Sequence, residues 1–166
     1  MSRDIDLKDF SKFLGIIAPN VEAEVTNVII LCCQKVRSDI QDSMAKTERN
    51  MEKSYYTHNE KIPHHPSLPG NPPARDTGNL SNSIRYEVYA QPGSPYGVVG
   101  TTQQDPPYGE YMEYGTSKGG WGGKGVAPRP WLRPAMHKNN DWIRQSITKA
   151  VVKGMKEVSG LRGAEE

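Results

Sequence analysis

Residues 19–51, PNVEAEVTNVIILCCQKVRSDIQDSMAKTERNM, decide the fold of this chain. Apolar side chains recur through the stretch at helical spacing, with charged and amide side chains between them: Val21, Val25, Val28, Cys32, Val36, Ile40, Met44 and Met51. This spacing predicts one apolar stripe on a helix of about 30 residues, about 45 Å long. Such a helix packs across a sheet, or against the same helix of a neighbouring subunit. A stripe buried within the chain accounts for most of the pattern.

The flanking segments predict further helices. Residues 7–17 form a shorter helical pattern, and Ala18-Pro19-Asn20 predicts a break, because proline suits the first turn of a helix and not its interior. Residues 136–158 predict a C-terminal helix with basic side chains between its apolar ones, and cations near its end complement the helix dipole. The stripe expected on that helix consists of Met136, Trp142, Ile143, Ile147, Val151, Met155 and Val158.

The middle of the chain is built of turns and short elements. All but one of the 13 prolines lie between residues 63 and 134, so regular helices belong to the two ends. Residues 54–75 predict an irregular, mobile loop. Alternation over residues 85–90 and 96–102, around a turn at 92–95, predicts a β-hairpin. Residues 108–114 predict a short helix.

We therefore expect one α+β domain over residues 1–166. A long N-terminal helix and a C-terminal helix pack on a small antiparallel β-sheet, with long Pro/Gly-rich loops. Its parts are a helical N-terminal part (1–53), the irregular loop (54–75), a hairpin and motif region (76–135) and the C-terminal helix (136–158).

Composition narrows the class of protein. The hydrophobic share is 35% and the mean hydropathy −0.71, so a monomer has only a thin core and either gains stability from neighbours or has long loops. The net charge of +2 requires no polyanionic partner. The longest apolar run, residues 28–33, is too short for a bilayer, and the N-terminal residues lack a secretory pattern, so we expect no membrane partner. Cys32 and Cys33 are adjacent, which excludes a disulfide framework and favours a reducing cytoplasm, with both as core residues.

No pattern in the chain predicts catalysis, a cofactor or a metal. The histidines at 58, 64 and 65 are interpreted as solvated loop residues, because no carboxylate or cysteine set surrounds them. The glycine-rich residues 119–125 lack the spacing of a phosphate-binding loop. Glu110 and Glu113 are three apart on the short helix, where solvated or ion-paired carboxylates are commoner than an acid–base pair.

Arg129 and Arg133 flank Trp131, and this arrangement has two interpretations. An aromatic ring between two arginines can stack on and clamp a nucleic-acid strand. Alternatively, the run is a turn fixed by its prolines, with Trp131 and Leu132 in the core. The net charge of only +2 favours the interpretation as a turn, because nucleic-acid-binding proteins usually have a strongly basic surface.

Three segments in order carry a resemblance to a known family: PARDTGNLSNSI at 73–84, YGEYMEYGT at 108–116 and PRPWLRPA at 128–135. They resemble the DTG-x-L-x-x-SI, Y-x-x-Y-x-E-x-GT and P-x-P-[FW]-L-R-P-A patterns of the neck and tail-completion family of long-tailed bacteriophages. That family includes proteins similar to the minor tail protein Z of lambda. The resemblance covers residues 73–135, and the glycine-rich residues 119–127 depart from it as an insertion-like loop.

The resemblance implies a non-enzymatic structural protein of the virion neck or tail end. Such a protein is assembled in the host cytoplasm as a subunit of a homo-oligomeric, sixfold ring that completes the tail and joins it to the head. Its expected partners are its own copies, neighbouring head-closure, tail-terminator or tail-tube proteins, and passing DNA without sequence specificity. The alternative is a DNA-contacting protein of the portal channel or the packaging machinery.

The expected motif residues are structural or interfacial. We expect Asp76 or Thr77 to cap a short helical turn beside Gly78, with the apolar Leu80 and Ile84 four residues apart. Gly115 is expected to end a helix, and Thr116 to cap the next segment of the chain. Arg133 is expected to bind Glu110 or Glu113. The full set is Thr77, Gly78, Leu80, Ile84, Glu110, Glu113, Gly115, Thr116, Pro130, Trp131, Leu132, Arg133 and Pro134.

Overall fold

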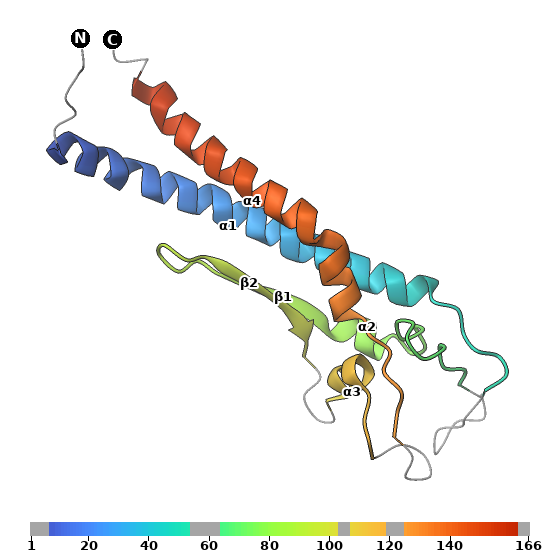
Figure 1. The fold of residues 1–166 in the computed structure, drawn as a ribbon. Helices are drawn as coiled ribbons and strands as arrows, with labels where there is room; N and C mark the ends of the chain where they lie inside the picture. The colour runs from blue at the N-terminus through green and yellow to red at the C-terminus, as the bar shows by residue number, and fades with distance from the viewer. Residues whose placement is uncertain (1–6, 54–63, 103–106, 119–124, 163–166) are drawn as a thin grey trace. The chain divides into compact units, whose positions relative to one another are not determined.

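A computed structural model describes residues 7–53, 64–102, 107–118 and 125–162. The chain has the predicted α+β fold, with long N- and C-terminal helices and a two-stranded antiparallel sheet (Figure 1). The elements in order are α1 (Leu7–Lys46), α2 (Asn79–Ser83), β1 (Ile84–Tyr89), β2 (Tyr96–Thr101), α3 (Tyr108–Tyr114) and α4 (Leu132–Arg162). The predicted hairpin and short helix are confirmed to within a residue of their ends. Residues 64–75 are irregular apart from one bridge residue, and the remainder of that predicted loop lies outside the described residues.

Helix α1 is continuous, so the predicted break at Pro19 is wrong. A proline inside a helix removes one backbone hydrogen bond and crowds the preceding turn. The neighbouring turn is held by tertiary contacts: Val21 lies against Gly154, and Glu24 binds Lys153. These contacts oppose the local preference of proline, as tertiary context often does with helix propensity.

The stripe on α1 is confirmed along most of its length. Cys32, Val36, Ile40 and Met44 are all buried. The inclusion of Met51 is wrong, because α1 ends at Lys46 and Met51 is 70% exposed.

The described contacts divide the chain into two compact units. Unit 1 consists of residues 1–33, 87–98 and 140–166, and unit 2 of residues 34–86 and 99–139. Each unit therefore takes a part of α1, of the hairpin and of α4.

In unit 1, glycines permit close approach between elements. Gly97 of β2 lies against the side chains of Ile29 and Cys33, so this part of α1 packs directly on the sheet. The backbone N–H of Gly93, in the hairpin turn, donates to Glu22 Oε1 at 2.6 Å. Lys153 of α4 binds Glu24 of α1 with 2.9 Å between Nζ and Oε2.

In unit 2, Asp39 of α1 holds the start of α4. Its carboxylate accepts hydrogen bonds from Asn139 Nδ2 at 2.7 Å and Lys138 Nζ at 3.1 Å. Burial raises the pKa of Asp39, but hydrogen bonds from Asn139, Lys138 and Lys35 outweigh burial and lower it. Gln41, also on α1, donates to the carbonyl of Ser81 in α2 at 2.9 Å. One helix thus positions both α2 and α4.

The stripe predicted on the C-terminal helix is partly wrong. Helix α4 begins at Leu132 rather than at residue 136, and Met136, Trp142 and Met155 are 44%, 40% and 50% exposed. The predicted Ile143, Ile147 and Val151 are half-buried, and the side chain of Val158 lies outside the described part. The most buried positions are small or polar: Ala135, Asn139, Ala150 and Gly154. Small residues occupy this face because they let two backbones approach closely.

Gly154 tests this close approach, with Gly15 as the matched control. A Cβ at Gly154 would lie 2.8 Å from Val21 Cα, whereas one at Gly15 would meet nothing within 4 Å. We expect Gly154→Ala to lower the free energy of unfolding by about 1–3 kcal/mol, because overpacking outweighs helix propensity. Gly15→Ala should raise it by about 0.5–1 kcal/mol. Urea unfolding measures both, and a stabilised Gly154→Ala protein would contradict the packing described here.

Candidate functional site

The three sequence segments meet in unit 2, at Gly109 of α3. A Cβ on Gly109 would lie 2.6 Å from Thr101 Cγ2, 3.3 Å from Leu80 Cδ1 and 3.3 Å from Trp131 Cζ2. Leu80 belongs to the first segment, Gly109 to the second and Trp131 to the third. We call Leu80, Gly109, Glu113, Trp131 and Arg133 the three-motif cluster.

A buried carboxylate joins α3 to α4. Glu113 is only 3% exposed, and its Oε2 accepts the backbone N–H groups of Trp131 at 2.7 Å and Leu132 at 2.9 Å. Its Oε1 accepts the backbone N–H of Arg133 at 3.1 Å and the Nε of the same residue at 2.9 Å. Glu113 thereby caps α4, whose first N–H groups have no partner within the helix and carry partial positive charge.

The predicted partnership of Arg133 with Glu113 is confirmed. Arg133 Nη2 also donates to the backbone carbonyl of Glu113 at 3.1 Å, and its guanidinium lies 5.0 Å from the centre of the Tyr114 ring. The other candidate partner, Glu110, is exposed and forms no ion pair among the described residues.

The contacts of Glu113 set its protonation. Burial raises the pKa of this carboxyl, because it penalises the charged form. Hydrogen bonds from the N–H groups of Leu132, Trp131 and Arg133 outweigh burial and lower the pKa below its ordinary value. The ionised form is therefore the one that the fold stabilises.

Trp131 is a core residue. It is 3% exposed, and its Nε1 donates to the carbonyl of Gly109 at 2.8 Å. Its predicted burial is confirmed, and the ring is not available to stack on a base. Leu132 and Pro130 are half-buried, while Pro134 lies exposed in the first turn of α4, where proline is tolerated.

In the first segment, the capping role predicted for Asp76 or Thr77 is wrong. The N-cap of α2 is Gly78, in the left-handed conformation with φ +85°, and no side chain caps this helix. Thr77 Oγ1 instead accepts the N–H of Asn79 at 3.4 Å. A left-handed N-cap is a position for glycine, and this explains the residue there. The two apolar residues of this segment, Leu80 and Ile84, are both buried.

In the second segment, Gly115 ends α3 as predicted, but Thr116 caps no helix among the described residues. Gly115 has φ +73° and donates its N–H to the carbonyl of Tyr111 at 2.9 Å. Thr116 pairs with Val126: its N–H donates to the Val126 carbonyl at 2.9 Å, and its Oγ1 accepts the Val126 N–H at 3.1 Å. These two hydrogen bonds join the residues on either side of a loop. Residues 119–124 of that loop lie outside the described residues.

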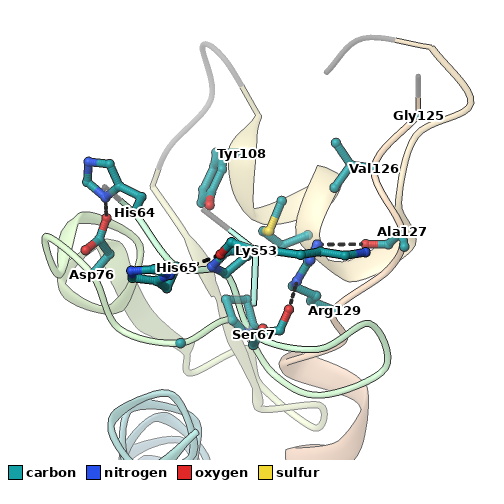
Figure 2. Close-up of a pocket in the computed structure, with 14 residues that line it drawn as sticks. Lys53, His64, His65, Ser67, Asp76, Tyr108, Gly125, Val126, Ala127 and Arg129 are labelled. Carbon is teal, nitrogen blue, oxygen red and sulfur yellow. Dashed lines mark hydrogen bonds and ion pairs between the residues drawn. The ribbon is translucent and has the colours of Figure 1, made fainter. Parts of the chain in front are cut away.

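Unit 2 also contains a cavity of about 580 Å³ (Figure 2). His64 lines it with a side chain only 13% exposed, and its Nδ1 contacts a carboxylate oxygen of Asp76. His65 Nδ1 lies 3.1 Å from the carbonyl oxygen of Lys53. The prediction that these two histidines are solvated loop residues is therefore wrong, because both are half-buried and line the cavity. His58 lies outside the described residues.

Among the described residues, neither Ser67 nor the two cysteines are activated as nucleophiles. Ser67 lines the cavity, but its Oγ is buried and has no hydrogen-bond partner in the described structure, so neither histidine is placed to take its proton. Burial raises the pKa of both Cys32 and Cys33, which opposes thiolate formation. Within the described residues, no group of three or more His, Cys, Asp and Glu side chains is arranged to hold a metal ion.

Comparison of the chain with protein-family models, curated proteins and solved structures finds no match in any of the three. Over the described residues, every helix is too short or too polar to cross a bilayer.

Glu113 and Glu110 form a matched pair for testing the cap. Glu113→Gln should lower the free energy of unfolding at neutral pH by about 1–3 kcal/mol, because the buried donors lose a charged acceptor. Glu110→Gln should change it by about 0.5 kcal/mol or less. Urea unfolding of both variants measures the difference.

The pH dependence of stability has a defined sign. Folding lowers the pKa of Glu113, so its contribution is present above the ordinary glutamate pKa and is lost as pH falls through the folded-state value. The stability gap between the wild-type protein and Glu113→Gln should therefore shrink in acid. A gap that stays constant or widens as the pH falls would refute this account of the cap.

Trp131→Ala separates the core interpretation from the DNA-clamp interpretation. Removing this buried ring should lower the free energy of unfolding by about 3–5 kcal/mol and reduce the cooperativity of melting. Arg133→Ala should lower the free energy of unfolding by less, because the Arg133 side chain is largely exposed to solvent. The substitution nevertheless removes one charged donor from Glu113. Thermal melts beside a duplex-DNA titration distinguish the cases. Variants that melt normally and lose only DNA affinity would favour the clamp.

Proposed function

We propose that this chain is a non-enzymatic structural subunit of the neck or tail end of a long-tailed bacteriophage, in a ring that completes the tail and joins it to the head. One observation carries the proposal. The three segments that resemble the neck and tail-completion family, far apart in sequence, contact one another at Gly109 and Glu113.

The roles of the motif residues favour architecture over chemistry. The Glu113 carboxylate is saturated by backbone and guanidinium donors, and Trp131 Nε1 by a carbonyl. A catalytic carboxylate needs an open approach for substrate, whereas this one is enclosed by the protein's own groups. The motif residues hold α3 and α4 in a fixed orientation. A fixed orientation suits a structural protein that binds neighbouring subunits through its surface.

Exposed aromatic side chains on α3 support assembly with other subunits. Tyr108, Tyr111 and Tyr114 recur at helical spacing and are 41%, 41% and 64% exposed. Tyrosines are enriched at protein interfaces, where the ring packs and the hydroxyl finds a polar partner. In unit 1, the stacked Tyr89 and Tyr96 of the hairpin are also exposed. We propose that such surfaces meet other copies in a sixfold ring, and head-closure, tail-terminator or tail-tube proteins.

The alternative is a DNA-contacting protein of the portal channel or packaging machinery. Its support is the set of basic residues on α4, which includes the exposed Arg144 and Lys149. Two other lysines of the set are in ion pairs, Lys138 with Asp39 and Lys153 with Glu24. Because Trp131 is also buried, weak and salt-sensitive DNA contact fits these residues better than a dedicated DNA site.

Assembly with the cognate virion tests the proposal. Mass spectrometry of purified virions should find the chain in a copy number that matches the sixfold tail. Sedimentation of the purified protein with its tail partner should show a complex. Tyr111→Ser should weaken that complex by about tenfold or more if the α3 tyrosines are interface anchors. Glu110→Gln, an exposed change next to Tyr111 in the same helix, is the control. Absence from virions, or a strict monomer in assembled particles, would refute the ring.

A further inference from the structure

The cavity in unit 2 has unbalanced positive charge. Its wall contains two cationic side chains, Lys53 and Arg129, and Asp76 is the only acidic residue among the described lining residues. Asp76 is already engaged by His64 and lies 3.8 Å from Arg49 Nη2. Neither Lys53 nor Arg129 forms an ion pair within the described residues.

Among the described residues, Arg129 is held in place by neutral groups. Its Nε donates to the Ser67 carbonyl at 3.0 Å and its Nη1 to the Ala127 carbonyl at 3.2 Å (Figure 2). Its backbone N–H donates to the Met112 carbonyl at 2.6 Å. These contacts fix the guanidinium but leave its charge uncompensated, which is the preorganised state of an anion-binding arginine.

Ser67 gives a second, independent indication of a ligand. It is 2% exposed and lines the cavity, and its Oγ has no hydrogen-bond partner in the described structure. A buried hydroxyl without a partner is unfavourable, and native proteins rarely keep one without a reason. The Oγ of Ser67 has almost no accessible surface, so an oxyanion in the cavity becomes its partner when the serine side chain rotates toward the ligand.

The remaining wall is apolar. Pro66, Pro73, Ala74, Met112 and Val126 line the cavity beside the ring of Tyr108. In Figure 2, Val126 lies on the side of the cavity opposite the His64–Asp76 pair. The volume of about 580 Å³ falls in the range of small-molecule sites. A bare inorganic ion would leave most of this wall without contact.

We propose that this cavity binds a small organic oxyanion, a carboxylate or a phosphate carried on an apolar or aromatic body. Arg129 and Lys53 attract the charge, Ser67 rotates its hydroxyl toward the ligand and donates a hydrogen bond, and the apolar wall packs on the body. The inference is independent of the proposed ring function, since it depends only on the cavity of unit 2.

Calorimetric titration of the full chain with three probes tests the site. Phenylacetate and phenyl phosphate carry the two oxyanions on the same ring, and benzyl alcohol is a neutral match. We expect at least one anion to bind saturably, and benzyl alcohol to bind about tenfold more weakly or not at all. The stronger of the two anions identifies the head group. Perturbation of the Met112 methyl signal in NMR spectra should place the ligand in the cavity.

Two variants and a control complete the design. Ser67→Ala should weaken binding of the anion about tenfold, the effect of one charge-assisted hydrogen bond. It should not lower the melting temperature of the free protein, because the lost hydroxyl has no partner. Lys53→Met changes an exposed residue and should weaken anion binding several-fold while leaving benzyl alcohol unaffected. Ser38→Ala, at an exposed serine of α1, should leave affinity unchanged.

Several results would overturn the site. These are no binding of either anion, equal affinity for benzyl alcohol, or anion affinity unchanged in both Ser67→Ala and Lys53→Met. A ring that assembles normally in variants without anion binding would leave the proposed assembly function intact. Failure of the site and failure of that function are thus distinguishable.

Discussion

The buried carboxylate of Glu113 is the contact on which the rest of unit 2 depends. Placing a charge at a site only 3% exposed is strongly unfavourable unless the charge is fully hydrogen-bonded. Full pairing is possible only where α3 ends beside the first turn of α4, because three of the donors are consecutive backbone N–H groups. The same contact therefore fixes the start of α4 and the direction in which it leaves the motif region.

Glycine residues, which have no side chain, allow close packing around that contact. Gly109 leaves space for Leu80 and Trp131, and the Trp131 indole then reaches the Gly109 carbonyl. In unit 1, Gly97 and Gly154 have the equivalent role against α1. Close packing of small residues allows a chain with a modest apolar content to bury its large side chains efficiently.

The three-motif cluster and the cavity have opposite chemical characters. In the cluster, the charged groups are paired and the ring nitrogen is satisfied, so it has little left to offer a ligand. Around the cavity, Arg129 is positioned without a counter-charge and Ser67 Oγ is unpaired. The first arrangement suits a structural joint and the second a binding site. Both use the segment 128–135, so the run that orients α4 also supplies the arginine of the cavity.

The sequence by itself determined the element types, the stripe from Cys32 to Met44, the burial of Trp131 and the pairing of Arg133 with a glutamate of α3. The element types and the stripe follow from spacing within a short window. The burial of Trp131 and the pairing of Arg133 were expected from residue chemistry, and the structure chose between the alternatives. Only the tertiary structure decided that Pro19 lies inside a helix, that small residues form the buried face of α4, and that Glu113 rather than Glu110 is the cap. It also decided that His64 lies in a cavity wall. These outcomes depend on contacts between residues distant in sequence, whose distances and donors no local pattern encodes.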